Sequence, residues 1–124
     1  MTGTNSPLGI GRATVHQFAR NGAKAIYICD YSTTYLEVHQ RELHELYPSV
    51  KIHPRKIDAG DEGDVERVVN EALEAYGRLD VFFANAGISI TTKRVLDSSG
   101  EDFMKVMKTN ALRSASNYPR QSLY

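Results

Sequence analysis

The spacing of apolar residues along the chain predicts four amphipathic helices. The strongest pattern follows Asp61, where apolar residues recur at i, i+3, i+4, i+7, i+8 and i+11 and stop before Gly77. An earlier helix begins after the Ser32-Thr33-Thr34 cap and ends at Pro48. The residues expected to share one face of a helix are Ile10, Ala13, Thr14 and Phe18 before Asn21-Gly22; Leu36, His39, Leu43 and Leu46, which face the core; Val65, Val68, Val69, Ala72, Leu73 and Tyr76; and Phe103, Val106, Met107 and Asn110 between about Gly100 and Leu112.

Short apolar runs between these helices predict buried strands. Residues 25–29 are apolar, and Asp30 ends the run. Residues 50–57 alternate loosely, and Pro54 weakens this prediction because proline cannot donate to a strand ladder. Residues 79–84 predict another buried strand. Strands and helices that alternate in this way build right-handed βαβ units, so the expected class is α/β, with a parallel sheet covered by helices on both faces.

The periodic pattern covers residues 1–112, which we interpret as one domain. A chain of 124 residues is long enough for a single hydrophobic core. Residues 113–124 are polar, contain Pro119 and lack a strand pattern, so this segment is expected to be an irregular tail.

Composition narrows the classes of partner. The chain has 15 Lys and Arg residues against 15 Asp and Glu residues, so no overall field favours nucleic acid or an anionic membrane. No apolar run approaches the roughly 18 residues of a membrane span, and no signal sequence is visible. The single cysteine, Cys29, cannot form an internal disulfide and is expected to be a buried strand residue rather than a nucleophile. These features predict a cytoplasmic protein.

The four histidines do not predict a metal site. His39 and His44 are separated by about 140° around a helix, which places them poorly for a shared metal ion. His16 and His53 lie in other segments of the chain.

Glycines at the start of the chain predict a phosphate-binding turn. Thr2-Gly3 and Gly9-Ile10-Gly11 precede the first helix, and glycines at this position let a diphosphate approach the free N–H groups of the helix N-terminus. The plainer alternative is a flexible turn.

Asp30 follows Gly11 by nineteen positions, at the end of the first predicted strand. An acidic residue at this spacing binds the ribose 2′-OH of a dinucleotide, although a strand-end carboxylate without a ligand is the alternative. A carboxylate repels a 2′-phosphate unless a cation offsets it, and neither Tyr31 nor Leu8 is basic. We therefore expect NAD to be preferred over NADP.

Four short segments together resemble the short-chain dehydrogenase/reductase family, over roughly residues 2 to 112. Thr2-Gly3 with Gly9-Ile10-Gly11 resembles its TGxxxGIG turn, and Asn85-Ala86-Gly87 resembles its NNAG segment, with Ala84 in place of the first Asn. Asp58 and Asn110 match the family's adenine-contacting acid and the Asn of its catalytic tetrad. Each segment alone is weakly specific, but their order and separations are typical of the family.

The resemblance implies an NAD(P)-dependent oxidoreductase with an alcohol or ketone substrate. It implies that Gly3, Gly9, Ile10, Gly11, Asp30, Asp58, Asn85, Ala86 and Gly87 bind the dinucleotide and that Asn110 is catalytic. The alternatives from the residues alone are a turn cap for Asp58, a tight turn for Asn85 to Gly87, and an ordinary polar residue near a helix end for Asn110.

The chain also departs from the family. Five residues separate Gly3 from Gly9 where the family usually has three, so Gly3 is a weaker candidate than Gly9 and Gly11. The catalytic Ser and the Tyr-x-x-x-Lys pair are not found after Asn110. The first strand of the doubly wound sheet is missing before Thr2. We therefore expect an incomplete Rossmann-like domain, truncated at both ends.

Two consequences follow for the fold and the function. Without its first strand, the sheet either brings residues 79–84 beside residues 25–30 or is loosely ordered outside its helices. The open, apolar sheet edges would also permit oligomerisation. The function is either that of a short-chain oxidoreductase in the full-length form or that of a catalytically inactive nucleotide-binding or interaction fragment.

Overall fold

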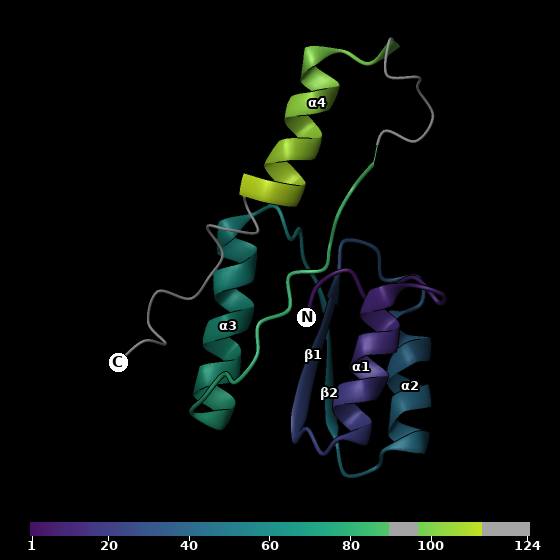
Figure 1. Ribbon diagram of the computed structural model, residues 1–124. Coiled ribbons are helices and arrows are strands. Elements are labelled where there is room, and N and C mark those ends of the chain that lie inside the picture. Colours follow the sequence, from purple (N-terminus) through teal and green to yellow (C-terminus); the bar gives the residue numbers. More distant parts are fainter. Residues whose placement is uncertain (90–96, 113–124) are drawn as a thin grey trace.

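The computed structural model describes residues 1–89 and 97–112. Their elements follow in the order α1 (Ile10–Arg20), β1 (Ala25–Asp30), α2 (Leu36–Leu46), β2 (Lys51–Lys56), α3 (Glu62–Tyr76) and α4 (Gly100–Met107), with a final π-helical turn, η2 (Lys108–Leu112). Figure 1 shows α1 and α2 on one side of the strands and α3 on the other. The expected tail, residues 113–124, lies outside the described part of the chain. None of the described helices is long and apolar enough to cross a membrane.

Strands β1 and β2 form a parallel pair in which Ala25 pairs with Lys51 and Asp30 with Lys56. The two strands are those predicted at residues 25–29 and 50–57. Pro54 is accommodated because alternate residues of a parallel ladder turn their backbone groups to opposite sides. Lys51 N–H donates to the carbonyl of Lys24, so the odd residues of β2 face β1 and Pro54 turns its missing donor to the open edge.

Each face of the strand pair has its own apolar core. Helices α1 and α2 cover one face, where Val15, Ile28 and Leu43 are fully buried. On the other face, Tyr27 and Cys29 pack against Val65 and Val68 of α3. The arrangement of helices on both faces of a parallel sheet is therefore confirmed, with a sheet of two strands in the described residues.

Residues 79–84 are not a strand, and this prediction is wrong. The segment is extended but has no ladder, and its side chains are exposed or half-buried; Val81 is 51% exposed. A buried strand needs hydrogen-bonding neighbours, and the neighbour this segment touches is only two residues long. Thr2 N–H donates to the carbonyl of Phe83, 3.1 Å away.

Met1 and Thr2 form a short extended segment beside β1. Thr2 forms a parallel bridge with Cys29, and Cys29 N–H donates to the carbonyl of Met1. On the opposite side Thr2 bonds to Phe83, so Met1 and Thr2 lie between β1 and the segment 79–84. The expected closure of residues 79–84 beside β1 is therefore not observed.

The helix ends differ in how they are stabilised. The Asp61 side chain caps α3 by accepting from Asp64 N–H, and Gly77 ends it with φ +71°. The predicted Ser/Thr cap of α2 is wrong, because Tyr35 is its N-cap and makes no side-chain cap bond. Leu46, the last residue of α2, is 58% exposed rather than buried. Helix α4 has a Ser99 capping box but no buried residue.

Candidate functional site

The predicted phosphate-binding glycines meet the predicted NNAG-like loop. A Cβ on Gly11 would lie 2.2 Å from the Gly3 carbonyl oxygen, and a Cβ on Gly3 would lie 2.8 Å from Ala86 Cα. Gly3 also has φ +70°, a conformation that L side chains rarely adopt. Both positions therefore require glycine, and the longer loop after Gly3 has not moved it away from Gly11.

The amino end of α1 begins directly at this contact. Gly9 is its N-cap, with an extended backbone and no side-chain cap, and Ile10 is the first helical residue. The first turn of α1 contains no acidic residue. Helix N–H groups without intrahelical partners and the positive end of the helix dipole favour an anion such as a diphosphate here.

Asn85 fixes the loop that follows residues 79–84. Its side-chain amide donates to the carbonyls of Thr2 (3.2 Å) and Gly3 (3.0 Å). In return, the Thr2 hydroxyl accepts from the backbone N–H groups of Asn85 and Ala86. Thr2 is buried, so this exchange of four bonds ties the glycine turn to residues 85–86.

Asp30 lies at the carboxyl end of β1 and faces the same glycine turn. One carboxylate oxygen accepts from Asn5 N–H (3.0 Å) and the other from Ser32 N–H (3.1 Å). Asn5 also accepts from Tyr35 N–H through its side-chain oxygen. The five-residue loop is therefore pinned beside Asp30, and each carboxylate oxygen keeps a lone pair for a further donor.

Asp58 has a local role in the structure. Its Oδ1 accepts from Gly60 N–H at 2.8 Å, and its own N–H donates to Asp64. This geometry is that of a turn cap, the predicted alternative to adenine contact. The side chain is exposed, and one of its two oxygens makes no bond in the described part of the chain.

Asn110 is part of η2 and clamps the loop after Asn85. Its side chain accepts from Ile88 N–H and donates to the Ile88 carbonyl, both at 2.8 Å. A Cβ on Gly87 would lie 3.4 Å from the same side-chain oxygen. Asn110 therefore fixes residues 87–88, and π-helical turns such as η2 often occur at functional sites.

The sequence did not predict the contact between His39 and His16, which it placed apart. Their rings stack with centroids 5.3 Å apart, and Arg12 forms an ion pair with Glu42 beside them. His39 is fully buried, and neither ring nitrogen has a hydrogen-bond partner in the described residues. Burial lowers the pKa of His39 to about 4, and the charges of Arg12 and His16 act in the same direction.

Most of the predicted site residues thus form one connected cluster. Hydrogen bonds and close contacts join Gly3, Gly11 and Asn85, and Asn5 connects this turn to Asp30. Asp58 follows the neighbouring strand, and its hydrogen bonds are to Gly60 and Asp64 rather than to the cluster. The residues lie at the carboxyl ends of parallel strands, where open α/β sheets bind ligands.

Comparison with known proteins identifies the same part of the chain. A sequence model of the family described as short chain dehydrogenase matches residues 1–117. Levodione reductase of Leifsonia aquatica is 34% identical over 107 residues, which are 86% of this chain and 40% of that protein. The chain therefore spans about two fifths of the length of this relative.

Solved structures share the fold. The crystal structure of levodione reductase matches with a TM-score of 0.82 at 33% identity, over 94% of this chain and 44% of that one. An alcohol dehydrogenase from the archaeon Thermococcus sibiricus, complexed with 5-hydroxy-NADP, matches at 0.80 and 30% identity, over 94% of this chain and 48% of the other. NAD+-bound xylitol dehydrogenase matches at 0.79 and 27% identity, over 94% and 43%.

Proposed function

The chain belongs to the short-chain dehydrogenase/reductase family, and on this premise we propose that its strand-end cluster binds a nicotinamide dinucleotide. The observation that carries this proposal is the close contact between Gly3 and Gly11 at the start of α1, which we call the glycine cradle. No side chain fits at Gly11 because its Cβ position is 2.2 Å from the Gly3 carbonyl. This close packing holds the glycine turn against the first residues of α1, whose N–H groups have no intrahelical partners and favour a diphosphate.

In this proposal each part of the cluster has one task. Ile10 and Gly11 present backbone N–H groups to the diphosphate. Gly3 and Gly9 shape the turn beside them, where Gly9 N–H donates to the Ser6 carbonyl, and residues 85–87 form the adjoining wall. Asp30 accepts hydrogen bonds from the adenosine ribose. Asp58 is the candidate for adenine contact, through the carboxylate oxygen that does not cap its turn.

We propose NAD rather than NADP as the cofactor. The solved relatives include one with NAD+ bound and one with an NADP derivative, so the family admits both. In this chain the Asp30 carboxylate is held in place by Asn5 and Ser32, and no cation is paired with it in the described part of the chain. Arg12, the basic residue of the first turn of α1, is engaged by Glu42. A 2′-phosphate beside Asp30 would therefore be repelled.

We propose that the full-length protein is an oxidoreductase acting on an alcohol or ketone. The nicotinamide, when bound, supplies or accepts the hydride. The part this chain contributes is to hold the dinucleotide and, through Asn110, to fix the loop at residues 87–88. After Asn110 the 124 residues contain no Tyr-x-x-x-Lys pair, so we propose that this chain alone binds the cofactor without turnover.

The experiment that tests cofactor choice is an Asp30→Asn substitution, with NADH and NADPH affinities measured by nicotinamide fluorescence. Loss of a charged acceptor weakens a hydrogen bond by about 1.5–3 kcal/mol, so we expect the NADH affinity to fall at least about tenfold. The NADPH affinity should fall less or rise. Glu74→Gln, which removes one exposed surface charge elsewhere, is the matched control. An unchanged ratio of the two affinities would refute the role of Asp30.

A further inference from the structure

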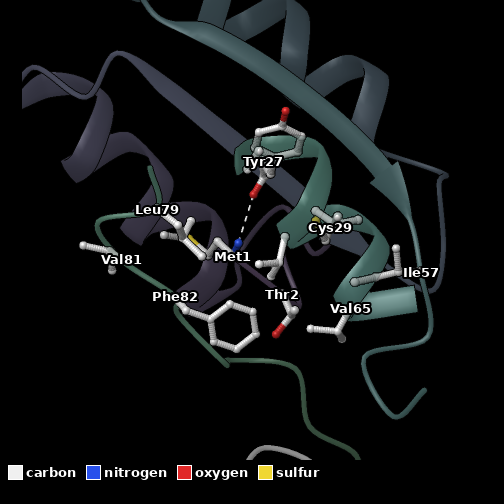
Figure 2. Close-up of a pocket in the computed structure, with 12 residues that line it drawn as sticks. Met1, Thr2, Tyr27, Cys29, Ile57, Val65, Leu79, Val81 and Phe82 are labelled. Atoms are coloured by element: carbon white, nitrogen blue, oxygen red, sulfur yellow. Dashed lines mark hydrogen bonds between the residues drawn. The ribbon is translucent and has the colours of Figure 1, made fainter. Parts of the chain in front are cut away.

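The five-residue loop of the glycine turn is anchored to the carboxyl end of β1. Thr2 lies beside Cys29 at this end of the strand (Figure 2), where the two residues form a parallel bridge. Thr4 is fully buried and donates to the Cys29 carbonyl through its N–H (3.4 Å) and its hydroxyl (3.3 Å). The next residue of the loop, Asn5, therefore lies beside Asp30, the residue that follows Cys29 in β1.

Asn5 connects three segments of the chain. Its backbone N–H donates to Asp30 Oδ2 at 3.0 Å, and its side-chain oxygen accepts from Tyr35 N–H at 2.8 Å. Tyr35 is the N-cap of α2 and makes no cap bond with its own side chain, so Asn5 supplies an acceptor to the start of this helix from another part of the chain. The glycine turn, the end of β1 and the start of α2 are thus joined through one residue.

The two oxygens of the Asp30 carboxylate are held in different ways. Oδ1 accepts from Ser32 N–H, two positions further along the chain, and this local bond by itself lets the carboxylate turn about it. Oδ2 is held from a distant part of the chain, by Asn5 N–H. A carboxylate held through both oxygens keeps one orientation. Its remaining lone pairs then point in fixed directions, as a directional hydrogen bond to a ribose hydroxyl requires.

The side chain of Asn5 keeps its backbone N–H against the carboxylate. Thr4 fixes the loop on one side of Asn5, but residues 6–8 on the other side are exposed, so packing does not hold them. The bond from Tyr35 N–H is therefore the contact that holds Asn5 from the side of α2. Removal of the Asn5 amide would leave Tyr35 N–H to water and would let the loop withdraw from Asp30.

We propose that Asn5 is a positioning residue for cofactor selection: anchored on the start of α2, it holds the Asp30 carboxylate in the orientation that accepts from the adenosine ribose and repels a 2′-phosphate. This inference rests on the proposed binding of a nicotinamide dinucleotide. A carboxylate that is held only by Ser32 can turn away from a 2′-phosphate. Loss of the Asn5 side chain therefore weakens NADH binding and relieves the repulsion of NADPH.

The test measures the NADH and NADPH affinities of the 124-residue chain and of its Asn5→Ala variant by nicotinamide fluorescence. We expect the ratio of NADH to NADPH affinity to fall at least about threefold, as for the loss of one hydrogen bond. Asn5→Asp keeps an acceptor for Tyr35 N–H and should keep or exceed the parent's ratio, because its added charge repels a 2′-phosphate further. Asn21→Ala, which removes a side-chain bond to the Gln17 carbonyl at the other end of α1, is the matched control and should leave the ratio unchanged.

A double-mutant cycle shows whether Asn5 acts through Asp30. In an Asp30→Asn background, Asn5→Ala should leave the ratio unchanged, because the carboxylate that Asn5 orients is gone. Three results would each overturn the inference: an equal change of the two affinities in Asn5→Ala, a ratio in Asn5→Asp as low as in Asn5→Ala, or the same fall of the ratio in the Asp30→Asn background. The parent chain separates this failure from that of the proposed function, because a parent that binds neither cofactor overturns both.

Discussion

His39 should make the stability of this chain depend on pH. The imidazole is fully buried beside His16 and Arg12. Burial and these two charges lower its pKa, and the backbone of Thr4 raises it by a smaller amount. In the unfolded chain its pKa is about 6.5, and in the folded chain it is about 4. Between pH 6.5 and about 4, the unfolded chain therefore binds a proton at His39 that the folded chain does not bind.

The sign and size of the effect follow from this difference. At pH 7 the ring is neutral in both states, so there is no penalty. As the pH falls through 6.5 the unfolded chain gains a proton first, and the free energy of unfolding decreases until the pH reaches about 4. A pKa lowered from 6.5 to about 4 corresponds to a loss of roughly 3 kcal/mol, an order-of-magnitude value.

The assay is urea unfolding, followed by far-ultraviolet circular dichroism, at several pH values between 7 and 4. His39→Leu, which keeps an apolar side chain of similar size in the core, should remove this part of the pH dependence. His53 also has a lowered pKa, but it remains in both proteins and cancels in the difference. His16 has a lowered pKa and stacks on His39, so the same pair of curves in a His16→Gln background separates its contribution. The exposed His44, changed to Gln, is the control. Parallel stability curves for the parent and His39→Leu proteins would refute the reasoning.

Three further substitutions test the packing of the site and the sheet. Gly11→Ala should weaken NADH binding at least about tenfold and destabilise the fold by roughly 1–3 kcal/mol, because its Cβ meets the Gly3 carbonyl. Gly100→Ala is the control, since Gly100 has open space around it, and it should change neither quantity in the same titration and melting experiments. Asn85→Ala should cost about 1–3 kcal/mol in urea unfolding, since it leaves two carbonyls unpaired, and an effect below about 0.5 kcal/mol would contradict the role of these bonds. Pro54→Thr should change stability by less than about 0.5 kcal/mol, because the new N–H points to the open edge; a large gain measured by thermal melting would show that the edge is paired.

The elements that depend on local pattern were predictable. The i, i+3, i+4 spacing after Asp61 gave α3, and its Asp cap and glycine stop are in the structure. The apolar run before Asp30 gave β1. Both signals are carried by residues within one element, so a single sequence is enough to read them.

Residues 79–84 show where local pattern is insufficient. Their composition is that of a buried strand, but a strand is stabilised by its neighbours, and here Met1 and Thr2 provide only a short one. Because this neighbour is so short, residues 79–84 make one backbone hydrogen bond to it, from Thr2 N–H to the Phe83 carbonyl, and form no ladder. The sequence did not indicate that Met1 and Thr2 would lie between β1 and residues 79–84.

The spacing of residues along the chain predicted which of them lie together in the cluster, but it did not predict the hydrogen bonds between them. The Gly3–Gly11–Asn85 contact joins residues more than 70 positions apart, and a motif resemblance suggested their proximity without its geometry. The attachment of Asn5 to Asp30 was not foreseen, because it depends on the conformation of the longer loop. The burial of His39 was foreseen from its helical position, but its contact with His16 on a different helix was not.

We propose that these 124 residues contain a dinucleotide-binding site. Titration of the purified chain with NADH, followed by nicotinamide fluorescence and by thermal unfolding, measures the binding and its effect on stability. We predict saturable binding that raises the melting temperature, with weaker binding of NADPH. No saturable binding of NADH by a chain that unfolds cooperatively would contradict the claim, because the glycine cradle and Asp30 would then be present without holding the cofactor.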